Sequence, residues 1–378
     1  MRILPPGLAT RQGRSGAAAR CGVRNDTILK GIIMASSFSL VSLVERGRVP
    51  DALVRQGIRT LLDKRLITRD RGSDEANRAA LAEFADSLRE GPIALEIGER
   101  NRGHYGLPAS FFQEILGPRM KFSCCLFPPG VEDLDRGEEE MLAETCERAG
   151  IEDGMEILDL GCGWGSLALW IAEKFPACRV TAVAATDLQR EFVEARCAEQ
   201  GITAVRVITC DLNDVRVDGT FDRVMAVELL EYLHNWREIL ARIAGMLKPD
   251  GKLFVHLFSH RRFAYPYESE GEDTYLGRYF FAGGMMPSED LLSRFQDDLS
   301  LESRWSVPGI HYRKTAEAWL SRLDSRKSVV LPILRENHGA EGSVWLQRWR
   351  LFFMACCEMW GYGDGGEWGV SHYLLKRR

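Results

Sequence analysis

The chain has 378 residues, of which 45% are hydrophobic, and a formal net charge of −5 at pH 7. This length and composition predict a globular protein with a sizeable core, in one large domain or two smaller ones. The acidic balance and the lack of a long basic run argue against a nucleic-acid partner, and no apolar run is long enough for a transmembrane segment. The ten cysteines contain no C-x-x-C spacing, which argues against a metal site and for a reducing compartment.

The first 33 residues differ in composition from the rest. They contain six Lys or Arg and one acid, Asp26, with Gly, Ala and Pro between them. Organellar transit peptides have this composition, but so do disordered extensions, and Met34 offers a second start. We therefore expect residues 1–34 to be a disordered or targeting extension. The expected location is cytoplasmic, or the mitochondrion or plastid if the extension is a transit peptide.

A helical pattern follows this extension. Apolar residues recur at helical spacing between 44 and 88, and a polar turn at 71–74 divides them into two stripes. No catalytic constellation lies in this part of the sequence. We predict an N-terminal helical cap over residues 35–120 that covers the mouth of a site.

The stretch from Ile157 to Ser166, I-L-D-L-G-C-G-W-G-S, is the most informative in the chain. It predicts a buried strand, a tight glycine loop and the start of a helix, which is the opening of a nucleotide-binding βαβ unit. Glycine has no Cβ, so the backbone of such a loop can pass close to a ligand. The loop resembles the first motif of S-adenosylmethionine-dependent methyltransferases, in which it would face the carboxylate and ammonium of the ligand.

Strands and helices alternate after the glycine loop. Strands are expected at 179–184, 205–209, 221–227 and 253–257, and helices at 188–200 and 236–246. Residues 261–298 read as an insertion near a ligand. Final strands are expected at 299–307 and 371–375, with helices at 315–324 and 344–360 between them. This order predicts an α/β fold with a mostly parallel sheet.

Ligands of an open parallel sheet lie at the carboxyl ends of its strands. Thr186 and Gln189 could supply neutral hydrogen bonds after the second strand, which lacks the acid that usually holds a ribose. Asp211 is placed to accept a hydrogen bond from an adenine amino group. The candidate cofactor-binding residues are Ser123, Asp159, Gly161, Gly163, Gly165, Thr186, Gln189, Asp211 and Leu212.

Two carboxylates follow the fourth predicted strand. Glu228 and Glu231 are three residues apart, so they share a face of any helical turn that begins there. Carboxylates just past a buried strand are expected to have raised or coupled pKa values, which suits proton acceptance. The alternative is a pair of surface glutamates that open a helix, where acids favour the helix dipole.

Several motifs together resemble the coclaurine N-methyltransferase group within the cyclopropane-fatty-acyl-phospholipid synthase superfamily. They are S-C-C-L-F at 123–127, the glycine loop at 159–166, V-E-L-L-E at 227–231 and F-V-H at 254–256, with further matches at 263–265, 295–298, 309–312 and 366–368. The resemblance covers about residues 40–378. It implies a class I methyltransferase (Rossmann-like) fold over residues 121–378, with helices flanking the sheet, a lid insertion over the active site and S-adenosyl-L-methionine as methyl donor.

The resemblance also implies roles for site residues. Glu231 would accept a proton from the amine, Glu228 would hold the negative potential, and Tyr232 would hydrogen-bond where the alkaloid enzymes have histidine. His256 is the next candidate for the base. Aromatic rings would line a pocket for a cationic amine. The residues assigned to this substrate or anion pocket are Cys124, Tyr105, Tyr265, Phe281, Tyr312 and Trp368.

The expected function is N-methylation of a small, tetrahydroisoquinoline-like amine. The cyclopropane synthases instead use bicarbonate as their base, and its ligands correspond to Cys124, Glu231, His256 and Tyr312. A lipid-modifying enzyme with a bicarbonate base is therefore one alternative, and a non-catalytic binding protein is another. A homodimer is left open.

Overall fold

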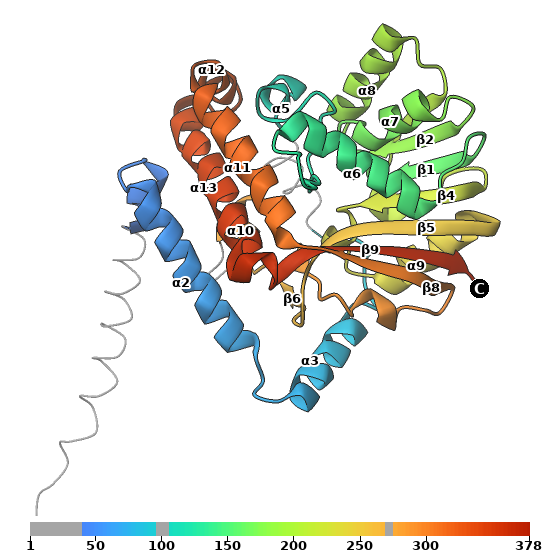
Figure 1. Ribbon diagram of the computed structural model, residues 1–378, viewed down its shortest axis with the longest axis horizontal. Coiled ribbons are helices and arrows are strands. Elements are labelled where there is room, and N and C mark those ends of the chain that lie inside the picture. The colour runs from blue at the N-terminus through green and yellow to red at the C-terminus, as the bar shows by residue number, and fades with distance from the viewer. Residues whose placement is uncertain (1–39, 96–105, 269–274) are drawn as a thin grey trace, which may run out of the picture. The chain divides into compact units, whose positions relative to one another are not determined.

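The computed structural model describes residues 40–95, 106–268 and 275–378 (Figure 1). The chain divides into two compact units, residues 1–49 and 50–378, and the described part of the first contains a short helix over 40–45. The predicted extension at 1–34 lies outside the described residues. Within the described ranges, no helix has the length and apolar character needed to cross a bilayer.

A seven-stranded sheet forms the centre of the second unit. In sheet order its strands are β3 (Val205–Thr209), β2 (Arg179–Ala184), β1 (Glu156–Leu160), β4 (Phe221–Val227), β5 (Leu247–His260), β9 (Trp368–Arg377) and β8 (Leu299–Val307). Strands β1 to β5 are parallel, and β9 runs antiparallel to both of its neighbours. The strand order reverses between β1 and β4, which is where open α/β sheets bind ligands. The prediction of a mostly parallel sheet is confirmed.

The sheet buries both of its faces against helices. The flanking helices are α6 (Leu134–Ala149), α7 (Ser166–Lys174), α8 (Asp187–Gln200) and α9 (Trp236–Met246). Successive side chains of a strand point to opposite faces. Accordingly, Ile157 belongs to a core cluster with residues of α6 and α7, and Leu158 belongs to a second cluster with residues of α9. Burial on both faces explains why these strands read as continuous apolar runs.

Helices from the two ends of this unit pack on one another. They are α2 (Asp51–Arg69) and α5 (Ala109–Ile115) from the N-terminal part, and α11 (Gly309–Ser325), α12 (Lys327–His338) and α13 (Gly342–Trp360) from the C-terminal part. Helix α3 (Asp74–Ser87) instead joins the core cluster that contains α9. Helix α2 lies along α13 (Figure 1), where Arg350 forms an ion pair with Asp51 at 2.6 Å. The predicted helices at 315–324 and 344–360 correspond to α11 and α13, whereas α12 was not predicted.

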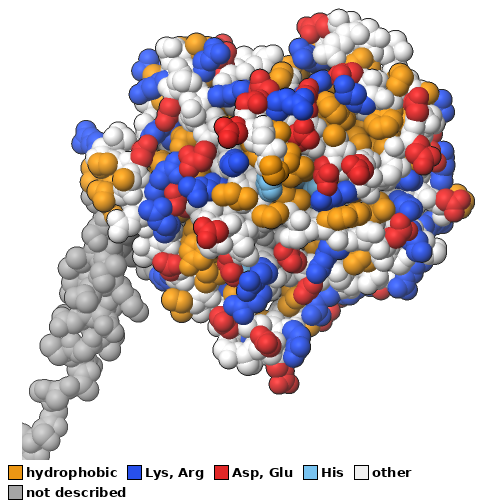
Figure 2. All heavy atoms as spheres, viewed as in Figure 1, with side chains coloured by type: hydrophobic (Ala, Val, Ile, Leu, Met, Phe, Trp, Pro, Cys, Tyr) orange, Lys and Arg blue, Asp and Glu red, His pale blue; other side chains and the backbone are white. Residues whose placement is uncertain are grey.

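The predicted insertion contains short elements. Strands β6 (Tyr265–Pro266) and β7 (Met285–Met286) pair antiparallel, and helix α10 (Tyr275–Tyr279) lies between them in the chain. The insertion contributes Phe281 to the site described below. Figure 2 shows acidic and basic side chains interspersed over one face of the molecule.

Candidate active site

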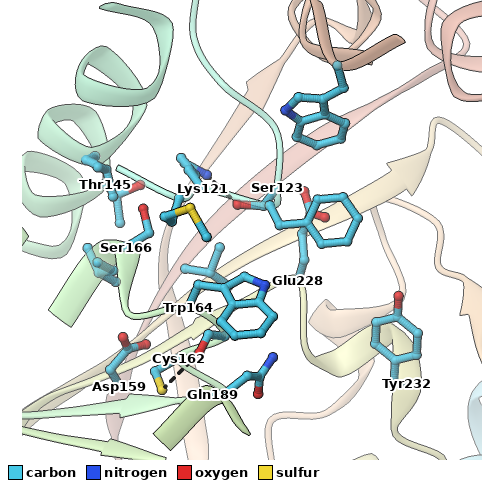
Figure 3. A pocket seen from close by; sticks show the side chains of 18 of the residues that line it. Lys121, Ser123, Thr145, Asp159, Cys162, Trp164, Ser166, Gln189, Glu228 and Tyr232 are labelled. Carbon is cyan, nitrogen blue, oxygen red and sulfur yellow. Dashed lines mark hydrogen bonds between the residues drawn. The ribbon is translucent and has the colours of Figure 1, made fainter. Parts of the chain in front are cut away.

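A cavity lies at the carboxyl ends of β1 and β4 (Figure 3). Its walls include Met120, Lys121, Phe122, Ser123, Thr145, Asp159, Gly161, Gly163, Trp164, Ser166, Gln189, Glu228, Tyr232, Phe281, Tyr312, Trp319 and Phe352. A second hollow shares Gly161, Gly163, Gln189, Glu228 and Tyr232, and adds Val183, Ala184, Ala185, Cys210 and Leu212. The two hollows share the glycine loop as a common wall. The second hollow lies at the ends of β2 and β3, and the first is lined by several aromatic rings.

The three glycines of the loop have different tasks. All have positive φ, at +84° for Gly161, +53° for Gly163 and +81° for Gly165. A Cβ on Gly165 would lie 2.7 Å from Val193 Cγ2, and one on Gly161 would lie 3.0 Å from Leu229 Cδ1. A Cβ on Gly163 meets nothing within 4 Å. Gly161 and Gly165 therefore permit close packing, while Gly163 keeps the cavity side of the loop open to a ligand.

Asp159 is a buried acid in the cavity wall. Its side chain is 2% exposed, and Oδ2 has no hydrogen-bond partner among the described residues. Burial raises the pKa of Asp159 to about 7, although a backbone hydrogen bond from Ala168 opposes this. An unpaired buried carboxylate oxygen beside an open glycine is suited to a ligand that brings a hydrogen-bond donor or a positive charge.

Lys121 is a functional candidate that the sequence reasoning missed. It is 3% exposed and lines the same cavity, where its Nζ donates a hydrogen bond to Ser123 Oγ (Figure 3). A buried ammonium is costly unless an anion or several acceptors surround it. The signal in the sequence was a lysine two residues before the Ser123 motif, but spacing alone does not distinguish it from a surface lysine.

The other predicted cofactor residues divide into two groups. Gln189 is 1% exposed and Leu212 is 7% exposed, and both line the hollows, with Gln189 held by a hydrogen bond from the Ala185 amide. Thr186 instead caps helix α8 by accepting from the Gln189 amide, and Asp211 accepts from the Asn213 amide at 2.8 Å. Neither Thr186 nor Asp211 is among the residues that line the two hollows.

Glu228 presents its carboxylate to the cavity in a strained backbone conformation, with φ of +47°. Its Oε1 accepts a hydrogen bond from the Cys124 amide at 2.9 Å, and its Oε2 accepts one from the Tyr312 hydroxyl at 2.7 Å. His256 Nε2 lies 3.4 Å from Oε1. Burial raises the pKa of Glu228, while the Cys124 amide, Lys121 and Tyr312 oppose that shift. A non-glycine residue in this region of φ is typical of a functional position.

Glu231 lies in a different environment from Glu228. It is fully buried and is not among the residues that line the cavity. Its Oε1 accepts from the Phe258 amide at 2.7 Å, and its Oε2 has no partner among the described residues. Burial and the nearby Glu228 raise the pKa of Glu231 well above its ordinary value. Because Glu228 has a positive φ, it lies outside the helical turn that begins at Leu230. The two glutamates therefore do not share one helix face, as the spacing had predicted.

The predicted aromatic residues do not all meet in one place. Tyr232 and Phe281 stack with ring centroids 5.6 Å apart, and both line the cavity with Tyr312. Trp368 donates its indole N–H to the Tyr265 hydroxyl at 3.1 Å, and neither residue is in the cavity wall. Tyr105 lies outside the described residues. Burial raises the pKa of the Cys124 thiol well above its ordinary value, so that Cys124 contributes its amide rather than a thiolate.

Comparisons with known proteins identify the family of the chain. The family model for mycolic acid cyclopropane synthetase matches residues 96–364. The (S)-coclaurine N-methyltransferase of Thalictrum flavum subsp. glaucum is 36% identical over 344 residues, which make up 90% of this chain and 95% of that protein. The cyclopropane-fatty-acyl-phospholipid synthase of Escherichia coli K12 is 27% identical over 248 residues, 63% of this chain and 62% of that one.

Solved structures show the same architecture. A crystal structure of coclaurine N-methyltransferase bound to N-methylheliamine and SAH superimposes with a TM-score of 0.87 at 34% identity, over 90% of this chain and all of that one. The cyclopropane synthase MmaA2 from Mycobacterium tuberculosis reaches a TM-score of 0.63 at 19% identity, over 75% of this chain and 99% of that one. The latter likeness concerns the fold alone.

The sheet order, with a glycine loop at its switch point, defines a class I methyltransferase fold. The chain belongs to the mycolic acid cyclopropane synthetase family. It is an S-adenosylmethionine-dependent methyltransferase, as the sequence predicted, and S-adenosyl-L-methionine is its methyl donor.

Proposed function

We propose that this enzyme methylates the nitrogen of a small, tetrahydroisoquinoline-like amine. The observation that carries the proposal is the carboxylate of Glu228, which the Cys124 amide and the Tyr312 hydroxyl hold in the cavity wall. Several relatives that are 30–36% identical over about nine-tenths of this chain are named N-methyltransferases, which supports the same acceptor atom.

The donor side of the cavity fits S-adenosylmethionine. Gly163 leaves open space, and Asp159 offers an unpaired buried oxygen for the ammonium of the donor. Lys121 and Ser123 would face its carboxylate, because both line the cavity wall and the ammonium of Lys121 attracts an anion. The hollow lined by Ala184, Leu212 and neighbouring residues would hold the adenosine part. When bound, the donor supplies an electrophilic methyl group on a sulfonium.

The acceptor must lose a proton before it can attack. An alkyl amine with a pKa of about 10 is mostly protonated at neutral pH. We assign Glu228 as the group that hydrogen-bonds the amine and takes its proton, since its carboxylate faces the cavity and burial raises its pKa toward the working range of a general base. Tyr232 and Phe281 would contact the amine through their ring faces.

This assignment differs from the sequence expectation, which gave Glu231 the role of base. Glu231 is fully buried and does not line the cavity, whereas Glu228 does. A general base must lie within hydrogen-bond reach of the proton that it takes. We therefore propose that Glu231 supports the backbone of β5 through the Phe258 amide, and that Glu228 acts on the substrate.

The bicarbonate alternative finds less support. Cys124 and Tyr312, two of the expected anion ligands, donate their hydrogen bonds to Glu228, and His256 also lies against it. A carboxylate of the chain thus takes the hydrogen bonds that a small anion would need. We expect a reaction with no dependence on added bicarbonate.

A screen with isotope-labelled donor tests the proposed function. The panel contains tetrahydroisoquinolines, acyclic amines and unsaturated phospholipids, each with and without bicarbonate, and mass spectrometry identifies the product. Transfer to a tetrahydroisoquinoline nitrogen in bicarbonate-free buffer is the expected result. Transfer to lipid alkenes that requires bicarbonate would contradict the proposal.

A further inference from the structure

A line of polar groups runs from Glu228 through His256 and His372 to Arg148 at the end of α6. His256 Nε2 has no hydrogen-bond partner among the described residues. His256 Nε2 lies 3.4 Å from Glu228 Oε1, and His256 Nδ1 lies 2.9 Å from His372 Nε2. His372 Nδ1 in turn lies 2.9 Å from Arg148 Nη1. Both imidazoles are fully buried. His256 on β5 and His372 on β9 are directly opposed in the antiparallel register, so the sheet itself brings the rings together.

The chemistry of arginine determines which atom donates and which accepts in each hydrogen bond of this line. A guanidinium has N–H donors and no acceptor, so His372 Nδ1 must accept the hydrogen bond from Arg148. A neutral imidazole carries one proton, which places it on Nε2 of His372, facing His256 Nδ1. His256 Nδ1 must then accept. The proton of His256 is left on Nε2, which faces Glu228.

Both histidines are suited to this neutral arrangement. Burial lowers the pKa of each of them well below its ordinary value, and the positive charges nearby, Lys121 and Arg148, act in the same direction. Arg148 is itself fixed at the end of α6. It forms an ion pair with Glu144 at 2.5 Å, and its guanidinium lies over the ring of Trp305 at 5.4 Å.

We propose that Arg148 and His372 are positioning residues that fix His256 as the Nε2–H tautomer, so that an N–H of His256, and not a lone pair, faces the carboxylate of Glu228. The proposal rests on the role assigned to Glu228 above. It means that His256 is not available to take the proton of the amine, because the nitrogen nearest the cavity already carries one. It also places an N–H of His256 3.4 Å from Glu228, in addition to the Cys124 amide and the Tyr312 hydroxyl that donate to this carboxylate.

Nitrogen NMR of the histidine side chains tests the tautomer directly in the substrate-free protein. The signals are assigned by their loss in His256→Gln and His372→Gln variants. We expect both imidazoles to be neutral, with the proton on Nε2 in each. A proton on Nδ1 of His256, or an imidazolium at neutral pH, would overturn the proposal.

Two substitutions at His372 form a matched pair. Glutamine can accept from Arg148 through its carbonyl and donate to His256 through its amide, so His372→Gln should retain the His256 tautomer. His372→Leu breaks the line and should give a mixture of tautomers at His256. If His372→Leu does not fold, Arg148→Met provides the same break from a partly exposed position. A His256 spectrum unchanged in a folded His372→Leu or Arg148→Met variant would contradict the proposal.

Steady-state kinetics of the two His372 variants provide a second, independent test. With a methylated amine in hand, His372→Leu should lower kcat about 10-fold at nearly constant KM and constant affinity for S-adenosylhomocysteine, whereas His372→Gln should stay near the wild type. Equal losses in the two variants would mean that His372 matters for packing alone. If no amine in the panel is methylated but the tautomers are as expected, the proposed function fails while the hydrogen-bond direction stands.

Discussion

The donor side and the acceptor side of the cavity are built in different ways. The donor side comes largely from one continuous stretch, Asp159 to Ser166, that closes a strand and opens a helix. The acceptor side is assembled around Glu228 by hydrogen bonds that span 104 residues to Cys124 and 84 residues to Tyr312. If these assignments hold, donor binding should depend more on local backbone geometry than the chemistry at the acceptor, which should depend on the tertiary fold.

The largest expected effect tests the local character of the donor side. Gly163→Val should abolish binding of S-adenosylhomocysteine in calorimetry, because its side chain would enter open cavity space. Gly201→Val is the matched control. Gly201 also has positive φ, at +68°, and a Cβ there also meets nothing within 4 Å, but it ends helix α8 away from the cavity. Equal loss of binding in the two variants would mean that backbone strain, not ligand contact, is responsible.

The same contrast explains what could be predicted from sequence. The strand, loop and helix at 157–171 could be predicted from local periodicity and from the glycines of the loop, which have positive φ in the structure. Cys124 and Tyr312 were assigned through the family resemblance, since nothing in their spacing places them beside Glu228. Helix α12 was missed because Pro332 usually interrupts a helix, and here packing against α5 and α13 outweighs that preference.

The second prediction separates the two glutamates. Glu228→Gln keeps the shape of the side chain but removes the proton acceptor, so kcat for the amine should fall about 100-fold or more. Glu231→Gln should change kcat by only a few-fold, because an amide resembles the protonated acid that burial favours at that position. Donor affinity should be retained in both variants. A larger loss in Glu231→Gln than in Glu228→Gln would return the role of base to Glu231.

The third prediction tests Lys121 on the donor side. If its ammonium faces the carboxylate of the donor, Lys121→Met should weaken S-adenosylhomocysteine binding by about 10-fold to 100-fold, the range for a hydrogen bond between charged groups. Binding of 5′-methylthioadenosine, which lacks the amino-acid part, should stay nearly constant. Calorimetry with the two ligands gives the comparison, and a parallel loss for both would show that Lys121 acts through folding of the wall.

These three tests also show where tertiary structure adds information that the sequence lacks. Lys121 was not singled out because its burial follows from the packing of the loop before Ser123, where the fully buried Glu138 accepts hydrogen bonds from the Gly117, Arg119 and Lys121 amides. Conversely, aromatic character and the family resemblance placed Tyr265 and Trp368 in the pocket, although they bond to each other outside the cavity wall. Residue type indicates a site only when the fold brings the side chain to it.

The smallest effect is expected at Tyr232, where the two sides of the cavity meet. Tyr232 lines both hollows and stacks on Phe281, so we expect its ring to position the amine and not to take its proton. Tyr232→Phe keeps the stacking and removes the hydroxyl, and it should lower kcat/KM less than 10-fold. Tyr232→His should be tolerated and should extend the range of benzylisoquinoline amines that are methylated, because imidazole can take a proton near pH 7.

Both variants are assayed on the amine panel with and without bicarbonate. A loss of 100-fold in Tyr232→Phe would make the hydroxyl part of the proton route, and a gain in bicarbonate dependence without amine turnover would remove the amine from the acceptor side altogether.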